Sequence, residues 1–128
     1  MPLVACVDDS PQIHQQMQHT LEENLCRCLS IRDALRALPL LLEAKPDIIF
    51  LDVVMPVVNG YELCAQIRRS SALQDVPVVF LTSQDGIVDR LRAKLVGASG
   101  FLAKPVRGDR VSEVLVQHLC VPRSLPSN

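Results

Sequence analysis

The sequence is poor in aromatic residues and carries almost no net charge. Its 128 residues include no tryptophan, one tyrosine and three phenylalanines, and the formal net charge is −1. Binding of single-stranded nucleic acid by stacking needs several aromatic rings, and attraction to nucleic acid or to anionic lipid needs a strongly positive surface. We therefore expect no direct nucleic-acid partner and no membrane partner.

Long apolar runs and metal-type cysteine spacings are also missing. No run reaches the length of a membrane span, and no charged-then-apolar leader opens the chain, so a cytoplasmic location is expected. The five cysteines are odd in number and contain no Cys-x-x-Cys pair, which argues against a disulfide framework or a zinc site. Cys26 and Cys28 alternate in a predicted strand, where two small side chains on one face are the simplest interpretation and redox sensing is the alternative.

The composition that remains is that of an ordinary globular domain, with 48% hydrophobic and 21% charged residues. A chain of this length buries enough apolar surface to fold as one domain. We assign that domain to residues 1–121. Residues 122–128 contain two prolines and two serines and are expected to form a loose tail.

Five apolar segments alternate with five segments of helical periodicity. The predicted strands are residues 3–7, 26–31, 47–51, 76–81 and 100–103. Apolar or small residues at helical spacing mark the helices between them: Ile13, Met17 and Leu21; Leu35, Leu38 and Leu42; Gly60, Leu63, Cys64 and Ile67; Ile87, Leu91 and Leu95; Val111, Val114, Leu115 and Leu119. Strands that are apolar throughout and alternate with helices predict a parallel sheet covered on both faces.

Helix ends carry their own signals. Ser10 before Pro11 predicts the start of the first helix, and Asn24 is expected to end it in a left-handed turn. Asp33 is expected to cap the second helix, in which Pro39 predicts a kink or a frayed first half. Gly97 is expected to end the fourth helix.

The fold class that follows is α/β, an open, doubly wound sheet of five parallel strands. Five units are too few for the usual eight-unit barrel, so the open sheet is favoured. Ligands of such sheets bind at the carboxyl ends of the strands.

Polar residues stand where four of the five strands end. Asp8-Asp9 follows the first strand, Asp52 the third, Thr82 the fourth and Lys104 the fifth. Three carboxylates in one crevice repel one another unless a proton or a cation lies among them, and a solvent-open set of oxygen ligands suits Mg²⁺. A lysine and a hydroxyl beside them can hold a phosphoryl group, so the set fits an aspartyl-phosphate centre.

Each of these residues also has a simpler interpretation. An acidic pair before Ser-Pro favours a helix N-terminus, a Lys-Pro pair is most often a solvated turn, and threonine is common in strands. Their joint placement at successive strand ends favours the site over coincidence.

At these residues the sequence resembles the receiver domain of two-component response regulators, the CheY-like family, over about residues 3–119. The motifs are Asp8-Asp9, DVVMPVVNG from Asp52, Thr82-Ser83, and FLAKP ending at Pro105. The runs NGYELCAQIRR and DGIVDRLRAKLVGAS are further similar to receivers of the cyanobacterial PatA type. The resemblance implies a flavodoxin-like fold with strand order 2-1-3-4-5 and five helices.

The resemblance also implies roles for the site residues. Asp52 would accept a phosphoryl group from a histidine kinase. Mg²⁺ would be held by Asp9 and Asp52, with Asp8 contributing through water and the carbonyl of Val54 as a further ligand. The domain would catalyse only its own phosphorylation and dephosphorylation, and so would not be an enzyme acting on an outside substrate.

A switch is implied as well. Thr82 and Lys104 would contact the phosphoryl group, Phe101 would be the switch aromatic together with Thr82, and the Lys104-Pro105 bond would be cis. The surface of the fourth helix, fifth strand and fifth helix would then bind a downstream effector protein, with the chain a monomer or weak dimer. Val54 and Gln84 stand where the family varies the lifetime of the phosphoryl group.

One other function and a simpler role for Phe101 stay open. The fold could serve as a phosphorylation-independent scaffold with the same partner surface, and Phe101 could be plain core filling. A phosphatase or flavodoxin-like enzyme is disfavoured, because no Asp-x-Asp follows a strand and no Gly/Ser/Thr-rich loop follows the first strand.

Overall fold

The computed structural model describes residues 1–83 and 86–119 as one α/β domain, which confirms the predicted fold class. Five parallel strands form a sheet in the order β2-β1-β3-β4-β5. The strands are β1 (Leu3–Val7), β2 (Arg27–Ile31), β3 (Ile48–Asp52), β4 (Val78–Thr82) and β5 (Gly100–Ala103). The helices are α1 (Pro11–Glu23), the 3₁₀ turn η1 (Ala34–Arg36), α2 (Ala37–Ala44), α3 (Gly60–Arg69), α4 (Ile87–Leu95) and α5 (Gly108–Leu119).

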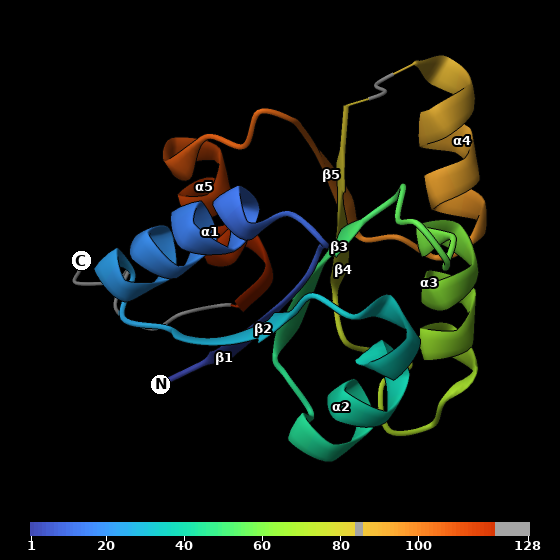
Figure 1. The fold of residues 1–128 in the computed structure, drawn as a ribbon, viewed down its shortest axis with the longest axis horizontal. Coiled ribbons are helices and arrows are strands. Elements are labelled where there is room, and N and C mark those ends of the chain that lie inside the picture. The colour runs from blue at the N-terminus through green and yellow to red at the C-terminus, as the bar shows by residue number, and fades with distance from the viewer. Residues whose placement is uncertain (84–85, 120–128) are drawn as a thin grey trace.

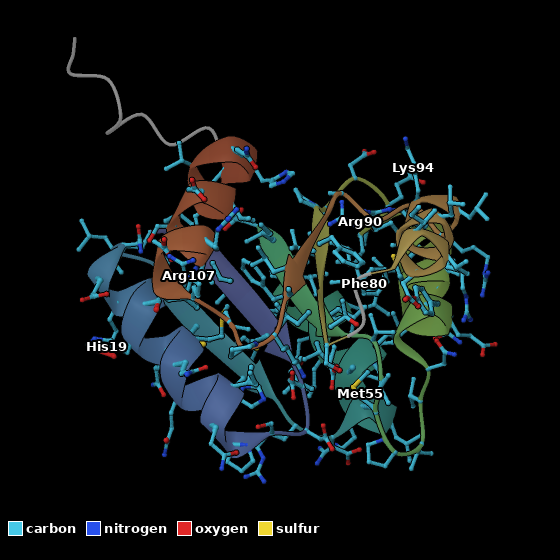
Figure 2. All side chains as sticks on the ribbon, turned by 90° about the horizontal axis from the view of Figure 1, so that it is seen from above. His19, Met55, Phe80, Arg90, Lys94 and Arg107 are labelled. Carbon is cyan, nitrogen blue, oxygen red and sulfur yellow. The ribbon has the colours of Figure 1, made fainter. Side chains whose placement is uncertain are left out.

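The sheet separates two apolar clusters. Helices α1 and α5 cover one face, and α2, α3 and α4 cover the other (Figure 1). Because side chains alternate along a strand, Val4 and Cys6 of β1 pack toward α1 and α5, while Ala5 and Val7 pack toward the other three helices. Every residue of β3 and β4 is buried. Figure 2 shows side chains filling both layers, with His19 on the outer side of α1.

Helix α1 follows its sequence signals except at its end. Ile13, Met17 and Leu21 are buried as predicted, and Pro11 is the first helical residue. At the end of α1 the residue with a left-handed backbone conformation is Leu25, with φ of 57°. The prediction that Asn24 would adopt it was wrong. The Asn24 side chain instead donates hydrogen bonds to the Thr20 carbonyl and the Ser112 hydroxyl, which ties the end of α1 to α5.

The second helical segment begins differently from the prediction. Asp33 caps the short turn η1 by accepting a hydrogen bond from the Leu35 amide, and Pro39 lies in the first turn of α2. Because a 3₁₀ turn winds more tightly than an α-helix, the face turned to the sheet shifts, and Leu35 and Leu42 are exposed rather than inward. The buried side chains of this segment are Ala37 and Leu41.

Strands β2, β3 and β4 begin later than predicted. β2 begins at Arg27, β3 at Ile48 and β4 at Val78, not at residues 26, 47 and 76. Pro77 has no amide hydrogen to donate to a sheet, and its carbonyl oxygen accepts a hydrogen bond from Ile49 at the edge of the ladder. The predicted tail, residues 122–128, lies outside the described residues.

Helix α4 spans the predicted residues and ends before Gly97, whose φ is +87°. The apolar row that predicted this helix, Ile87, Leu91 and Leu95, does not face the sheet. Ile87 is 78% exposed and Leu95 is 86% exposed. Ala93 is the one buried residue of this helix. None of the described helices combines the length and the apolar character that crossing a membrane requires.

Candidate functional site

The sheet brings three carboxylates together at the carboxyl ends of β1 and β3. These strands are neighbours, and Val7 pairs with Leu51, so Asp8 and Asp52 follow at the same level. Oxygens of Asp8, Asp9 and Asp52 all lie within 4.8 Å of one another. The sequence predicted this meeting from the placement of the three carboxylates at the ends of strands in a parallel sheet.

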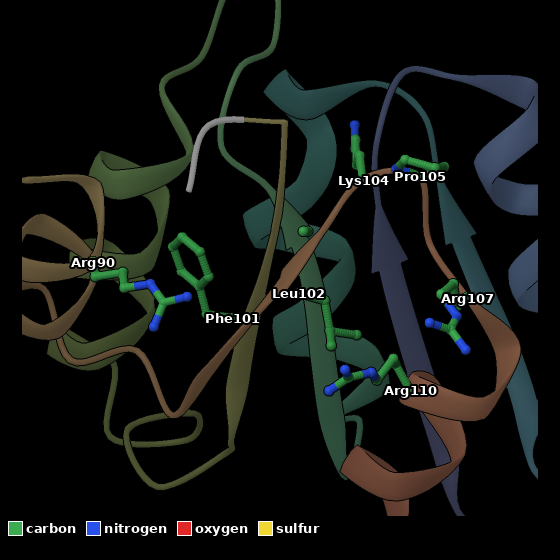
Figure 3. Close-up of a pocket in the computed structure, with 8 residues that line it drawn as sticks. Arg90, Phe101, Leu102, Lys104, Pro105, Arg107 and Arg110 are labelled. Atoms are coloured by element: carbon green, nitrogen blue, oxygen red, sulfur yellow. The ribbon is translucent and has the colours of Figure 1, made fainter. Parts of the chain in front are cut away.

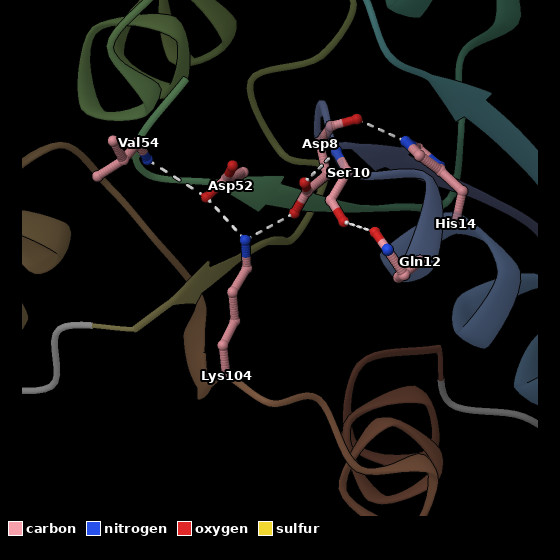
Figure 4. Close-up of polar contacts among 7 residues, drawn as sticks. All are labelled: Asp8, Ser10, Gln12, His14, Asp52, Val54 and Lys104. Atoms are coloured by element: carbon pink, nitrogen blue, oxygen red, sulfur yellow. Dashed lines mark hydrogen bonds and ion pairs between the residues drawn. The ribbon is translucent and has the colours of Figure 1, made fainter. Parts of the chain in front are cut away.

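Lys104 reaches the carboxylates from β5 across the end of β4. Its Nζ lies 3.0 Å from Asp8 Oδ2 and 3.2 Å from Asp52 Oδ1 (Figure 4). Its backbone N–H donates a 2.8 Å hydrogen bond to the carbonyl of Thr82, which anchors the chain where it leaves the sheet. The Lys104-Pro105 peptide bond that follows is cis, as expected.

Burial sets the protonation behaviour of the centre. Asp8 is fully buried and Asp52 is 4% exposed, whereas Asp9 is exposed. Burial and the neighbouring charge of Asp8 raise the pKa of Asp52 above its ordinary value, against the opposing effect of Lys104. Burial acts to lower the pKa of Lys104, but its contacts with Asp8 and Asp52 outweigh this effect and raise that pKa.

The donor set fits a divalent cation. Three carboxylates face one ammonium group, so negative charge is in excess when all of them are ionised. The Oδ2 atom of Asp8 is buried and, despite its ion pair with Lys104, has no hydrogen-bond partner among the described residues. Carboxylate oxygens are the ligands that Mg²⁺ prefers.

The loop that follows Asp52 folds back and hydrogen-bonds to the carboxyl end of β3. The Val54 amide donates a 3.3 Å hydrogen bond to Asp52 Oδ1, and the Val54 side chain is 66% exposed. Asn59 caps α3, and the Gly60 amide donates to the Val53 carbonyl at 2.9 Å. A Cβ on Gly60 would overlap the Asp52 carbonyl oxygen and lie 2.8 Å from Val53 Cα, so this approach requires glycine.

The two predicted switch residues lie on adjacent strands. Thr82 is the last residue of β4 and is 3% exposed. Phe101 of β5 pairs in register with Phe80, is half-buried, and has the Arg90 guanidinium 5.5 Å from its ring centroid. Gln84, expected to influence the phosphoryl lifetime, lies outside the described residues.

A basic groove lies beside the site between α4 and α5. Figure 3 shows Arg90 and Phe101 on one side of it and Arg110 on the other, with Leu102 between them. Its lining residues are Arg90, Phe101, Leu102, Ala103, Lys104, Pro105, Arg107 and Arg110. The groove thus joins the β5 end of the carboxylate site to the α4 surface.

Three contributors near the site were missed in the sequence. Gly60 was read as a helix position rather than as a point of close approach. Arg90 lies with Arg92 and Lys94 in a basic stretch for which the sequence favours a solvated helix face, with a partner surface as the alternative. His14 hydrogen-bonds the Asp8 backbone, and its one sequence signal was an ionisable residue three positions before Met17 on the apolar side of the first helix.

Comparison with known proteins decides the family. The model of the response regulator receiver domain matches residues 4–116. The chain belongs to this family. The receiver is 32% identical to Protein PilG of Pseudomonas aeruginosa over 116 residues, which covers 91% of this chain and 86% of that protein. It is 31% identical over 105 residues to the DNA-binding dual master transcriptional regulator RpaA of Synechocystis, covering 82% of the chain and 44% of RpaA.

A solved structure agrees with the fold of the receiver. The chemotaxis protein CheY4 of Vibrio cholerae superposes with a TM-score of 0.87 at 32% identity, covering 92% of this chain and 98% of that one. The receiver is therefore a signalling domain of the two-component response regulator class, with an acidic pocket of the phosphoacceptor kind. The finer resemblance to PatA-type receivers stays a prediction.

Proposed function

We propose that this receiver accepts a phosphoryl group on Asp52 from a histidine kinase in a Mg²⁺-dependent reaction. The observation that carries the proposal is the position of Asp52: a desolvated carboxylate at a strand end, with Lys104 Nζ 3.2 Å away and two further carboxylates beside it. Carboxylate nucleophile, cation site and lysine are the parts that phosphoryl transfer to aspartate needs.

The transfer is a single displacement at phosphorus. An Asp52 oxygen forms a bond to phosphorus as the bond between phosphorus and the kinase histidine nitrogen breaks, and that electron pair stays on the imidazole. Asp8, Asp9 and Asp52, with the Val54 carbonyl, would hold Mg²⁺, which supplies positive charge to the transferred group. Lys104 donates hydrogen bonds to the same group, and the receiver thereby catalyses its own phosphorylation. In its dephosphorylation a water oxygen forms a bond to phosphorus as the bond between phosphorus and Asp52 breaks, the carboxylate is regenerated, and a water proton passes to solvent.

The switch proposal follows from the strand neighbours of Asp52. A phosphoryl group on Asp52 adds negative charge and acceptor oxygens beside the end of β4. Thr82 moves to donate its hydroxyl hydrogen to a phosphoryl oxygen, and Phe101 turns into the space behind it. Arg90 contacts the Phe101 ring, so this turn also changes α4 and the basic groove.

That surface is where a downstream effector protein would bind. Arg90, Arg107 and Arg110 give the groove a positive lining, which favours an effector with acidic side chains. The exposed apolar residues of α4 support contacts of limited area, in keeping with a monomer or weak dimer. We place the receiver in the cytoplasm with its kinase, and assign no nucleic-acid contact to it.

The test is intact-mass measurement after incubation with Mg²⁺ and acetyl phosphate. We expect a gain of one phosphoryl group in the wild type and none in Asp52→Asn. The matched control is Asp47→Asn, which removes an exposed carboxylate just before the amino end of the same strand and is expected to label normally. Labelling of Asp52→Asn would contradict the assignment, and an unlabelled wild type that binds Mg²⁺ would favour the phosphorylation-independent scaffold.

A further inference from the structure

His14 is a buried polar side chain to which the proposed phosphoryl chemistry assigns no role. It is 6% exposed and stands on the buried face of α1 with Met17 and Leu21, which are fully buried. Met17 and Leu21 follow His14 by three and seven positions, so the three side chains form one row along the helix. An imidazole in an apolar row loses hydration and needs a polar partner there.

The partner of His14 is the backbone of the acidic pair. The ring Nε2 lies 2.6 Å from the carbonyl oxygen of Asp8 (Figure 4). A carbonyl oxygen only accepts, so Nε2 carries the hydrogen and donates it. The other ring nitrogen, Nδ1, is buried and has no hydrogen-bond partner within residues 1–83 and 86–119. Within that part of the chain, the hydrogen bond to Asp8 is therefore the one that the ring makes.

This contact completes the set that fixes Asp8. The Asp8 amide donates to the Ile31 carbonyl at 3.1 Å, and Oδ1 accepts from the Ser10 amide at 2.9 Å. Oδ2 pairs with Lys104, and the carbonyl is held by His14. Both backbone polar groups of Asp8 and both carboxylate oxygens thus have a defined neighbour.

Asp9 is held differently, because its side chain is exposed. The Asp8 carbonyl and the Asp9 amide belong to one planar peptide unit, so fixing the oxygen fixes the direction in which Asp9 leaves β1. Rotation of that peptide would carry the Asp9 carboxylate away from Asp8 and Asp52, whose oxygens lie within 4.8 Å of it.

We propose that His14 is a positioning residue for the cation site, acting through the Asp8–Asp9 peptide. Its Nε2–H holds the peptide in the orientation that sets the Asp9 carboxylate beside Asp52. The proposal rests on the Mg²⁺ dependence of the proposed function. The competing interpretation is a core histidine that satisfies a carbonyl and has no effect on the site.

Two amide substitutions separate these interpretations. In His14→Gln the side-chain amide nitrogen stands as many bonds from Cβ as Nε2 does, and in His14→Asn it stands as near as Nδ1 does. Both introduce the same polar group, so they make similar demands on folding. His14→Leu, which removes the donor altogether, is the third variant.

The measurement is the Mg²⁺ dissociation constant of the full chain by calorimetric titration with MgCl₂, with no phosphodonor present. We expect His14→Gln to bind Mg²⁺ nearly as tightly as the wild type, and His14→Asn and His14→Leu to bind about tenfold more weakly, the size typical of a lost ligand-orienting contact. The thermal unfolding midpoint of each variant is also measured in EDTA, to show that the metal-free variant is folded. Met17→Leu, in the same buried row but without a polar contact, is expected to leave Mg²⁺ binding unchanged.

Several outcomes would overturn the role of His14. They are wild-type Mg²⁺ affinity in all three variants, equal weakening in all three, a loss in Met17→Leu as large as in His14→Leu, and a wild type that binds no Mg²⁺. Phosphoryl uptake from acetyl phosphate is recorded on the same samples. A wild type that binds Mg²⁺ but is not labelled contradicts the proposed function, while the affinity series still reports on His14.

Discussion

At the scale of single residues, Asp52 combines reactivity with a stability cost. Its pKa is raised by burial and by the charge of Asp8. Between the ordinary aspartate pKa and this raised value, the folded protein binds more protons than the unfolded chain, so the free energy of unfolding falls as pH rises through that window. Above it, the folded state carries a carboxylate that it disfavours.

The prediction is that Asp52→Asn stabilises the metal-free receiver at pH 7.5. The neutral amide removes the desolvated charge and its repulsion with Asp8. Thermal unfolding in EDTA, followed by circular dichroism, is expected to show a higher midpoint for the variant at pH 7.5 and a shrinking difference as pH falls toward 4. An Asp52→Asn midpoint below that of the wild type at pH 7.5 would contradict the direction of the pKa shift.

Gly60 has no room for a side chain. An added Cβ would meet the backbone of Asp52 and Val53, neither of which can move without disturbing β3. We expect Gly60→Ala to lower the free energy of unfolding by about 2–3 kcal/mol through overpacking. Urea titration measures this. Gly100→Ala is the control, because the nearest atom to its Cβ would be 3.4 Å away, an ordinary contact.

At the scale of elements, one arginine joins two loops to α3 at the end of the sheet opposite the carboxylates. Arg68, near the end of α3, donates from Nε to the Gly97 carbonyl at 2.9 Å and from Nη1 to the Val76 carbonyl at 2.8 Å. Nη1 also reaches the Gln74 carbonyl, and Nη2 reaches the Ser99 hydroxyl. The connections before β4 and before β5 are thereby fixed to α3.

We expect Arg68→Ala to lower the free energy of unfolding by about 1–2 kcal/mol, since several hydrogen bonds from a charged donor are lost, including the part-buried one to the Val76 carbonyl. Arg68→Lys is expected to recover part of this loss, because an ammonium cannot reproduce the planar fork. Arg69→Ala is the matched control, as Arg69 is the exposed neighbour in the same helix. Equal loss in the two alanine variants would contradict the role assigned to Arg68.

Helix α4 buries a single side chain against the rest of the domain. Ala93 is 4% exposed, whereas Leu95 is 86% exposed. We expect Leu95→Gln to change the free energy of unfolding by less than about 0.5 kcal/mol. Ala93→Gln is expected to cost about 2 kcal/mol, because it forces a larger polar side chain into the core. Denaturant titration of the pair checks both values, and a large loss in Leu95→Gln would show that this row is buried in solution.

The sequence was a good guide to what the strands and their ends determine, and a poor one to how the helices pack against the sheet. The order of strands and helices and the convergence of Asp8, Asp52 and Lys104 followed from periodicity and strand ends. The inward face of α4 did not, because periodicity finds an apolar row but not what covers it. The contact of His14 with Asp8 likewise depends on how α1 packs beside β1.

At the scale of the whole molecule, the proposed Mg²⁺ site predicts that the cation stabilises the folded receiver. A cation that binds the folded state stabilises it by mass action, by about 2.7 kcal/mol at one hundred times its dissociation constant. We expect MgCl₂ to raise the unfolding midpoint of the wild type and to have a much smaller effect on Asp9→Asn. NaCl at matched ionic strength is the control for screening, and an equal response of the two proteins to MgCl₂ would argue against a site at Asp9.

The two-layered core has a consequence for how the molecule tolerates change. Among the described residues, Met17 and Leu41 belong to separate apolar clusters on the two sides of the sheet. Substitutions without shared neighbours combine additively, so the α1–α5 layer can diverge in a lineage without compensating changes under α2, α3 and α4.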